Sequence, residues 1–227
     1  MCLIVLGWRA HPRYPLLVAA NRDEFHARAA APAAYWRERP EILAGRDLQA
    51  MGTWMGVSRK GRFAAVTNYR GAREPSAAES RGALVSAFLA GAATAAAYLA
   101  DVAARGASYS GFNLLACDGT QLGWMSNRGG AARALEPGIY GLGNTLLDAP
   151  EVEPAKKRFA EAIQPSPAIE PLFGALAAAR IVNAQYGTRC STVLLLGEDR
   201  RIRYAERSFA ADGAEQDTVQ YEFAAAA

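Results

Sequence analysis

The order in which apolar runs and helix signals alternate constrains the fold of this chain more than any other feature. Short apolar segments separated by turn residues come in blocks, and a pair of helix signals lies between successive blocks. Blocks of antiparallel strands interrupted by helix pairs indicate two stacked sheets with helices outside, rather than alternating βαβ units. We therefore predict an α+β fold, a four-layer αββα sandwich of two antiparallel sheets flanked by helices.

The predicted strands are rich in apolar side chains and bounded by turn residues. They lie at residues 2–6, 16–20, 53–58, 62–68, 111–117, 121–126, 138–143, 191–196 and 201–206. The first two form a hairpin across a turn at residues 9–15, and the three between 111 and 143 form a second hairpin set. Residues 25–43 mix Ala, Pro, aromatic and charged side chains without a period, which predicts a long loop.

Four helices are predicted between these strands. The first follows Ser80 as its N-cap and ends at Gly91, and the second has Leu99 on its buried side. The other two span residues 150–163 and 171–183, with acidic residues in the first turn of the former.

Length and composition indicate one globular domain over residues 1–227. Of the 227 residues, 51% are hydrophobic, which is enough for a sizeable core, and no linker or repeat interrupts them. The formal net charge is +3 with the basic residues scattered, so no nucleic-acid surface is predicted. Frequent Ala, with Arg in preference to Lys, is the usage expected of a GC-rich bacterial genome.

Cysteine usage and the longest uncharged segment indicate where the protein resides. The three cysteines have no CxxC spacing, which predicts neither a disulfide framework nor a structural zinc site and suits a reducing cytoplasm. Residues 82–100 carry no charge, but Ser86, Gly91 and Thr94 interrupt them and their many alanines give a weak transfer energy. We expect two soluble helices there, no stable membrane insertion and a cytoplasmic protein.

Cys2 combines a thiol with the position next to the initiator methionine. A small second residue normally allows Met1 to be removed, which leaves an α-amine and a thiol on one residue. An α-amine has a reference pKa of about 7.7 to 8.0, so a useful fraction is neutral and takes the thiol proton, directly or through one water. Cys2 is therefore a candidate N-terminal nucleophile. The alternative is a small buried hydrophobe at the start of a strand.

A polar tetrad, Asn21-Arg22-Asp23-Glu24, directly follows the apolar run at residues 16–20. One cation, two carboxylates and an amide at a strand end can orient an amine, neutralise it and bind a substrate carboxylate. The alternative is a turn with local ion pairs.

Several segments together resemble one known family. The chain is similar to the NRDE family, the relatives of the transport and Golgi organisation protein, in its Met-Cys start and in AANRDEF, GTWMGVSRKGRFAAVTNYR, YGLGNTLLDAP and RCSTVLLL. The resemblance extends from Met1 to about Phe209, with the motifs in the expected order. It implies an Ntn-hydrolase-like fold, closest in layout to the choloylglycine hydrolase and penicillin acylase group.

The resemblance also implies roles for single residues. It makes Cys2 the nucleophile and the α-amine of Cys2 the base. It places the amide donors of an oxyanion hole at Asn68 and Asn144. It puts Arg189 close to the nucleophile, where a positive charge would favour the thiolate.

The tetrad matches the choloylglycine group less closely. That group follows its second strand with Arg-x-x-Asp, whereas here the same spacing joins Asn21 to Glu24. Either Arg22 and Asp23 fill the two places in a shifted register, or Asn21 and Glu24 fill them with altered chemistry. Both alternatives leave hydrolytic competence open.

The predicted function is a Cys2-dependent hydrolase of a linear amide or similar acyl bond in a small molecule, with a thioester intermediate and no required cofactor. The alternative is a non-catalytic protein that binds and hands over a hydrophobic ligand, haem or a lipid, since members of the family are implicated in haem trafficking and lipid homeostasis. His11 and His26 fall in predicted loops and are weak candidates for metal or haem ligands.

Overall fold

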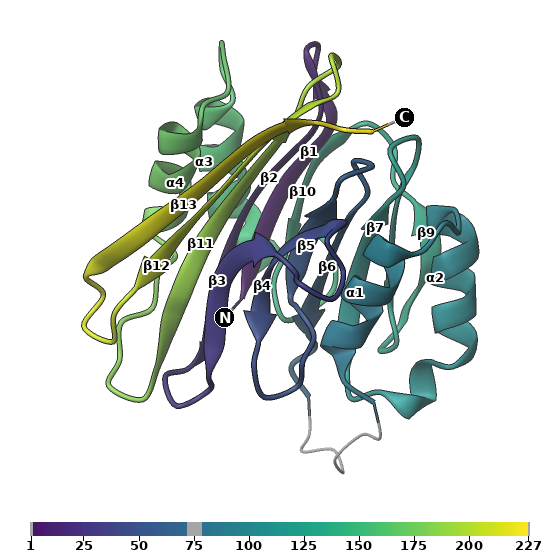
Figure 1. Ribbon diagram of the computed structural model, residues 1–227, viewed down its shortest axis with the longest axis horizontal. Helices are drawn as coiled ribbons and strands as arrows, with labels where there is room; N and C mark the ends of the chain where they lie inside the picture. The colour runs from purple at the N-terminus through teal and green to yellow at the C-terminus, as the bar shows by residue number, and fades with distance from the viewer. Residues whose placement is uncertain (1, 72–78, 227) are drawn as a thin grey trace. The chain divides into compact units, whose positions relative to one another are not determined.

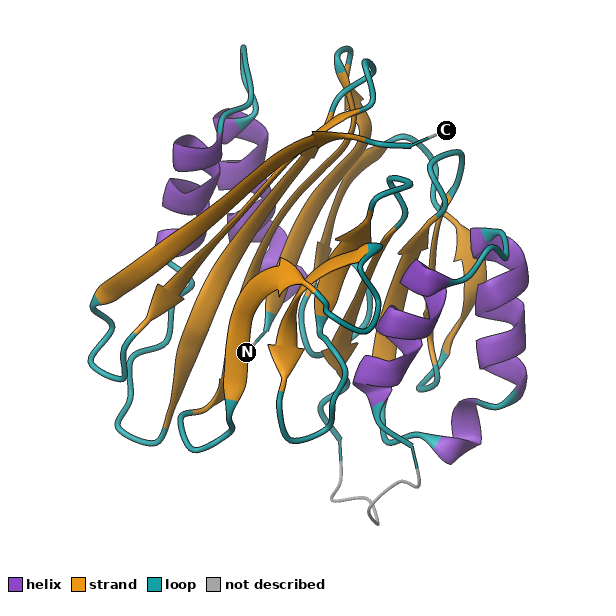
Figure 2. Ribbon diagram, viewed as in Figure 1, coloured by secondary structure: helices purple, strands orange, loops and turns teal. Residues whose placement is uncertain are grey.

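The computed structural model describes residues 2–71 and 79–226, and these form two compact units that interleave along the chain. The first unit comprises the chain up to Arg28 together with Glu136–Gly143 and Leu147–Ala224. The second comprises Ala29–Leu135 and Asn144–Leu146 with the C-terminal end. Each unit contains an antiparallel sheet and a pair of α-helices (Figures 1 and 2), which confirms the predicted α+β class with two antiparallel sheets and flanking helices.

The first unit is a six-stranded antiparallel sheet, counted over the described residues, with two helices on one face. Its elements are β1 (Leu3–His11), β2 (Tyr14–Phe25), β10 (Gly138–Leu142), a 3₁₀ turn (Pro150–Val152), α3 (Glu153–Ala162), α4 (Ile169–Ala177), β11 (Tyr186–Leu196), β12 (Arg201–Phe209) and β13 (Glu215–Ala224). The strand order is β10-β1-β2-β11-β12-β13. The apolar side chains of α3 and α4 join those of the central strands in one buried cluster, so β1, β2 and β11 are anchored in the middle of the unit.

The predicted N-terminal hairpin is confirmed, but the expected turn at residues 9–15 is too long. His11 pairs directly with Tyr14, which leaves Pro12 and Arg13 as the turn. An irregularity in the pairing just before His11 lets the strand continue through polar residues.

The sequence did not predict β13, which pairs with β12. Its side chains are exposed except for partly buried Val219, Tyr221 and Phe223 at alternate positions. An edge strand needs few apolar side chains, so its pattern is weak. The fourth helix was predicted over residues 171–183, but α4 is shorter and ends at Ala177.

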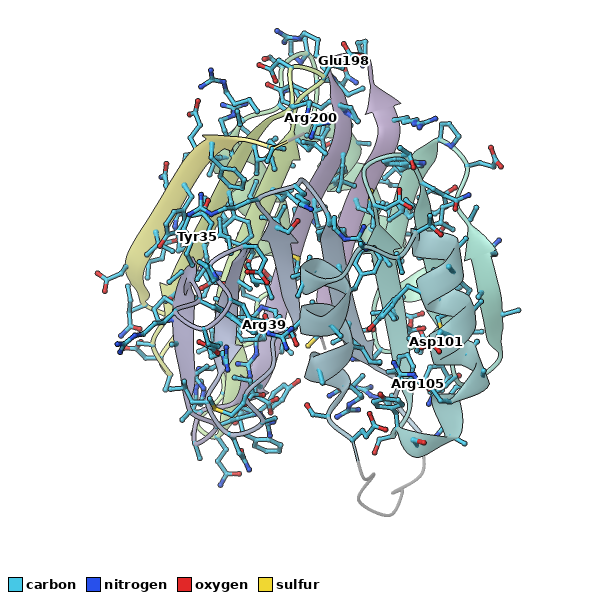
Figure 3. The ribbon with its side chains drawn as sticks, turned by 45° about the vertical axis from the view of Figure 1, so that its right-hand side comes forward. Tyr35, Arg39, Asp101, Arg105, Glu198 and Arg200 are labelled. Atoms are coloured by element: carbon cyan, nitrogen blue, oxygen red, sulfur yellow. The ribbon has the colours of Figure 1, made fainter. Side chains whose placement is uncertain are left out.

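The second unit is a seven-stranded antiparallel sheet, again counted over the described residues, with two helices on one face. Its elements are β3 (Ala30–Tyr35), β4 (Ile42–Asp47), β5 (Met55–Ser58), β6 (Phe63–Asn68), α1 (Arg81–Ala90), α2 (Ala95–Ala104), a 3₁₀ turn (Gly106–Ser108), β7 (Phe112–Cys117), β8 (Leu122–Ser126) and β9 (Gly130–Ala134). The strands follow one another in chain order. Figure 3 labels Asp101 of α2 and Arg105, the residue directly after this helix, and their side chains form an ion pair at 3.0 Å.

Three predictions for the middle of the chain are wrong. The segment at residues 25–43 is not a loop: it contains β3 and the start of β4, because an edge strand such as β3 tolerates Pro32. The strands predicted at residues 121–126 and 138–143 are not consecutive, since β9 lies between them. Finally, β10 is not part of a second hairpin set, because it pairs with β1 in the other sheet.

Strand alternation gives the first unit's sheet two different faces. Leu3 and Val5 of β1, with Leu17 and Ala19 of β2, point toward α3 and α4. Cys2, one residue before β1, therefore points to the face that α3 and α4 do not cover. No helix in the described part of the chain is long and apolar enough to span a membrane.

Candidate active site

Cys2 directly precedes β1 and is a partly buried residue. Its Sγ donates to the carbonyl oxygen of Asp23 at 3.4 Å. Burial raises the pKa of the Cys2 thiol above its ordinary value, while the positive charge of Arg22 acts in the opposite direction. The hydrogen bond to Asp23 thus fixes the position of the thiol near a cation. Because its pKa is raised, the thiol is predominantly protonated.

Arg22 lies between two cysteines on three adjacent strands. Leu3 pairs with Asn21 across β1 and β2, so the register continued by one residue places Cys2 opposite Arg22. On the other side of β2, Arg22 pairs with Cys190 of β11. Residues directly opposite each other in a sheet point to the same face, so the three side chains form one row. Arg22 is 6% exposed, and its charge acts on both thiols.

The polar tetrad divides between the two faces of the sheet. Arg22 and Glu24 share the face of Cys2, and their side chains approach to 3.8 Å. Glu24 is also 3.7 Å from Arg28, four residues on. Its carboxylate therefore lies between two guanidinium groups, and the two members of the tetrad that accompany Cys2 are neither of the pairs expected from the Arg-x-x-Asp comparison.

Asn21 points to the opposite face, toward α4. Its Nδ2 donates to the carbonyl of Leu176 at 3.2 Å, and its Oδ1 accepts from the hydroxyl of Ser191 at 2.6 Å. Both hydrogen bonds are shielded from water, since Asn21 and Ser191 are each 2% exposed. These contacts tie β2 to α4 and β11, so the structure places Asn21 in the packing between sheet and helix; the predicted catalytic role stays untested.

Asp23 contributes its backbone to Cys2 and its side chain to β11. Its Oδ1 accepts from the hydroxyl of Thr188 at 2.6 Å, and Thr188 Oγ1 in turn accepts from the backbone N–H of Ile181 at 2.8 Å. The carbonyl of Asp23 accepts from Tyr186 Oη at 3.2 Å as well as from Cys2. Asp23 therefore connects the start of β11 to the thiol.

Arg189 lies at a bulge in β11, where the pairing with β2 shifts. Its Nη1 donates to three carbonyls of the segment after β2, those of Phe25 at 3.0 Å, His26 at 3.2 Å and Arg28 at 3.1 Å. These contacts give Arg189 a role in holding this segment. Its predicted effect on the nucleophile stays a prediction.

The two predicted amide donors lie together in the second unit. Asn144 Nδ2 donates to the carbonyl of Asn68 at 2.8 Å, and the carbonyl of Asn144 accepts from the N–H of Arg70 at 2.6 Å. The side chain of Asn68 is exposed at the end of β6. Nearby, Asn113 donates to Thr67 Oγ1 at 3.1 Å, a buried pair that the sequence did not indicate.

The other cysteines differ from Cys2. Cys190 is 6% exposed, and burial together with the charge of Glu206 raises the pKa of its thiol well above the ordinary value. Cys117 is fully buried in β7. Both are therefore shielded from solvent, whereas Cys2 is partly exposed.

The histidines are poorly placed to bind haem or a metal. His11 is buried at the end of β1, not in a loop as expected, and its two ring nitrogens contact the N–H of Arg13 and the carbonyl of Pro165. His26 Nε2 lies 2.9 Å from the carbonyl of Asn183. Within residues 2–71 and 79–226, no group of three or more His, Cys, Asp or Glu side chains is arranged to hold a metal ion.

Sequence reasoning missed Tyr186, Thr188 and Glu206. The first two precede the predicted strand at 191–196, although β11 already starts at Tyr186. Glu206 is a carboxylate with only 1% exposure, hydrogen-bonded to Thr192 at 3.3 Å. Its signal was its position, because Glu206 continues the alternating series of Ile202 and Tyr204, whose side chains are buried.

Solved structures with a similar arrangement of strands and helices identify the fold. A Caenorhabditis elegans N-acylethanolamine-hydrolyzing acid amidase ortholog matches 86% of this chain and 92% of its own, at a TM-score of 0.55 and 11% identity. The C2A mutant of the conjugated bile acid hydrolase from Clostridium perfringens matches 98% of this chain and 97% of its own, at a TM-score of 0.52 and 10% identity. The chain therefore has the Ntn-hydrolase fold.

Sequence similarity specifies the family within this class. The family model "Transport and Golgi organisation 2" matches residues 1–182. The Transport and Golgi organization protein 2 homolog of Bos taurus is 35% identical over 98% of this chain and 99% of its own length. The chain belongs to the Transport and Golgi organisation 2 family, as the resemblance predicted.

Proposed function

We propose that this protein is an N-terminal-cysteine hydrolase that cleaves a linear amide or related acyl bond. The observation that carries the proposal is the environment of Cys2. Cys2 is a partly exposed residue whose thiol is hydrogen-bonded to Asp23 and lies beside Arg22, whereas Cys117 and Cys190 are buried. A partly exposed cysteine with a nearby cation is the kind that acts as a nucleophile.

The proposed reaction begins when Met1 has been removed. The neutral α-amine of Cys2 takes the thiol proton, and Sγ attacks the substrate carbonyl carbon. A C–S bond forms, the C–N bond breaks, and the leaving amine takes the proton from the ammonium group. Water then gives a proton to the α-amine and attacks the thioester, which releases the carboxylic acid and restores the thiol. The sum is amide plus water giving acid plus amine.

The first unit supplies the electrostatics of this proposal. The positive charge of Arg22 stabilises the Cys2 thiolate, which burial disfavours. The carboxylate of Glu24 approaches Arg22 to 3.8 Å and partly neutralises that positive charge, so Glu24 weakens the effect of Arg22 on the thiol. The assignment of oxyanion donors to Asn68 and Asn144 comes from the family resemblance and stays a prediction.

The test joins intact mass with trapping of the acyl-enzyme. The purified protein should lack Met1, and a rapid quench with an activated acyl amide should add the acyl mass to the peptide that contains Cys2. Cys2→Ala should abolish both the adduct and amine release, while Cys190→Ala should keep them. Retention of Met1, or equal turnover by Cys2→Ala, would refute the proposal.

The alternative proposal is a carrier of a hydrophobic ligand that does no chemistry. The exposed ring of Phe25, 59% exposed and packed at 5.3 Å against Tyr186, is the observation that favours it. Under this proposal a lipid bound by the wild-type protein is recovered unchanged, and Cys2→Ala binds it equally well. Haem titration of the same variants checks whether haem binds, since His11 and His26 would have to give up their present contacts.

A further inference from the structure

One backbone oxygen, the carbonyl of Asp23, accepts hydrogen bonds from two side chains that come from different strands. Cys2 Sγ approaches it to 3.4 Å at the start of β1, and Tyr186 Oη approaches it to 3.2 Å at the start of β11. The candidate nucleophile and a tyrosine hydroxyl thus share an acceptor. Tyr186 belongs to none of the motifs singled out in the sequence.

Contacts with neighbouring side chains restrain both Tyr186 and Asp23. The ring of Phe25 meets that of Tyr186 edge to face, with centroids 5.3 Å apart and planes at 75°. The hydroxyl of Thr188 binds the carboxylate of Asp23 at 2.6 Å, two residues along β11 from Tyr186. Both the acceptor and the second donor therefore have restricted freedom.

We propose that Tyr186 is a positioning residue for Cys2, which keeps a donor on the Asp23 carbonyl when the thiol gives up its proton. A protonated thiol can donate to that oxygen, but a thiolate cannot, and the sulfur charge is then repelled by the carbonyl dipole. The Tyr186 hydroxyl remains as a donor and withdraws charge from the oxygen. Ionisation of Cys2 consequently costs less than it would beside a carbonyl that had lost this donor.

The charged groups that face Cys2 belong to the first unit. They are Arg22, which favours the thiolate, and Asp23, which disfavours it, with Glu24 beside Arg22. Once Met1 is removed, the α-amine of Cys2 joins them. From β11, Cys190 lies on the far side of Arg22. Because Tyr186→Phe leaves all of these charges in place, a change in the ionisation of Cys2 in this variant reports the hydroxyl.

The experiment measures the rate of alkylation of Cys2 by iodoacetamide from pH 6 to 11, read by mass spectrometry of the Cys2 peptide in the full-length protein. In Tyr186→Phe the midpoint of the profile should rise by about 0.5 to 1 pH unit, with a loss of about three- to tenfold in rate at pH 7. Tyr140→Phe is the matched control, because Tyr140 Oη also donates to a backbone carbonyl of the first unit, that of Glu136 at 2.8 Å. Its profile should equal that of the wild type.

Phe25→Ala provides a second variant if Tyr186→Phe does not fold. It keeps the hydroxyl but removes the ring that orients it, so a smaller shift in the same direction is expected. Unchanged midpoints in the folded variants would overturn the inference. It rests on the proposed function for the use of the thiolate, yet alkylation needs no turnover: a shifted midpoint without hydrolysis would reject only the proposed function, and hydrolysis with an unshifted midpoint would reject only the role of Tyr186.

Discussion

Replacement of Asn21 by alanine separates a structural role of the tetrad from a catalytic one. The side chain of Asn21 makes two buried hydrogen bonds, to the carbonyl of Leu176 and from the hydroxyl of Ser191. Asn21→Ala removes both and leaves two polar groups buried between the sheet and α4. A buried group left without its partner costs about 1–3 kcal/mol, and the serine hydroxyl can rotate, so we expect a loss of about 2–4 kcal/mol in the free energy of unfolding.

Urea denaturation of four proteins measures this loss: the wild type, Asn21→Ala, Ser191→Ala and the double variant. Ser191→Ala should cost about 1–2 kcal/mol, because it leaves the Asn21 carbonyl oxygen without its donor. The double variant should cost less than the sum of the single variants by about 1 kcal/mol, since the two side chains share one hydrogen bond.

The same samples show whether Asn21 also acts on the nucleophile. Under conditions in which every variant is folded, the alkylation rate of Cys2 should change less than about twofold, because Asn21 and Cys2 lie on opposite faces of the sheet. A stable Asn21→Ala protein, within about 0.5 kcal/mol of the wild type, would refute the packing role. A folded variant in which Cys2 is alkylated ten times more slowly would show that Asn21 belongs to the active site.

Three further predictions concern other parts of the fold. Gly130→Ala should destabilise the protein by about 1–3 kcal/mol in urea denaturation, because an added Cβ would overlap the ring of Trp124; stability equal to the wild type would contradict this. Gly174→Ala should instead stabilise it by about 0.4–1 kcal/mol, since Gly174 lies in α4 with open space around it, and any loss would show a contact that the structure lacks. Tyr98 is partly buried and donates to a backbone carbonyl of α1, and burial raises its pKa to about 12, so its stabilising contribution is complete below pH 10 and is lost as pH rises from about 10 to 12. Tyr98→Phe should therefore be less stable at pH 8 but lose less stability than the wild type between pH 10 and 12.

The local pattern of the chain was sufficient for most elements and for the position of the candidate nucleophile. Dense apolar runs such as Leu16–Ala20 predict a buried strand wherever they occur, because burial of apolar side chains dominates the free energy of folding. Edge strands depart from this pattern: β3 and β13 pair on one side only, carry few large apolar side chains and were missed.

The sequence did not predict which strands pair with each other. Residues 138–143 read as a strand, but nothing in them indicates that β10 leaves its neighbours in the chain to pair with β1. Backbone hydrogen bonds are the same for every partner, so register and order depend on which apolar faces fit together in three dimensions.

What the sequence by itself determined is therefore the presence of Cys2 at the head of a core strand and a polar tetrad at the end of the next one. Only the tertiary structure decided which members of the tetrad accompany the thiol. A strand sends successive side chains to opposite faces, so the register of β1 against β2 places Arg22 and Glu24 with Cys2 and places Asn21 against α4. The approach of Tyr186 likewise comes from β11, more than 160 residues away along the chain, and no local pattern could have indicated it.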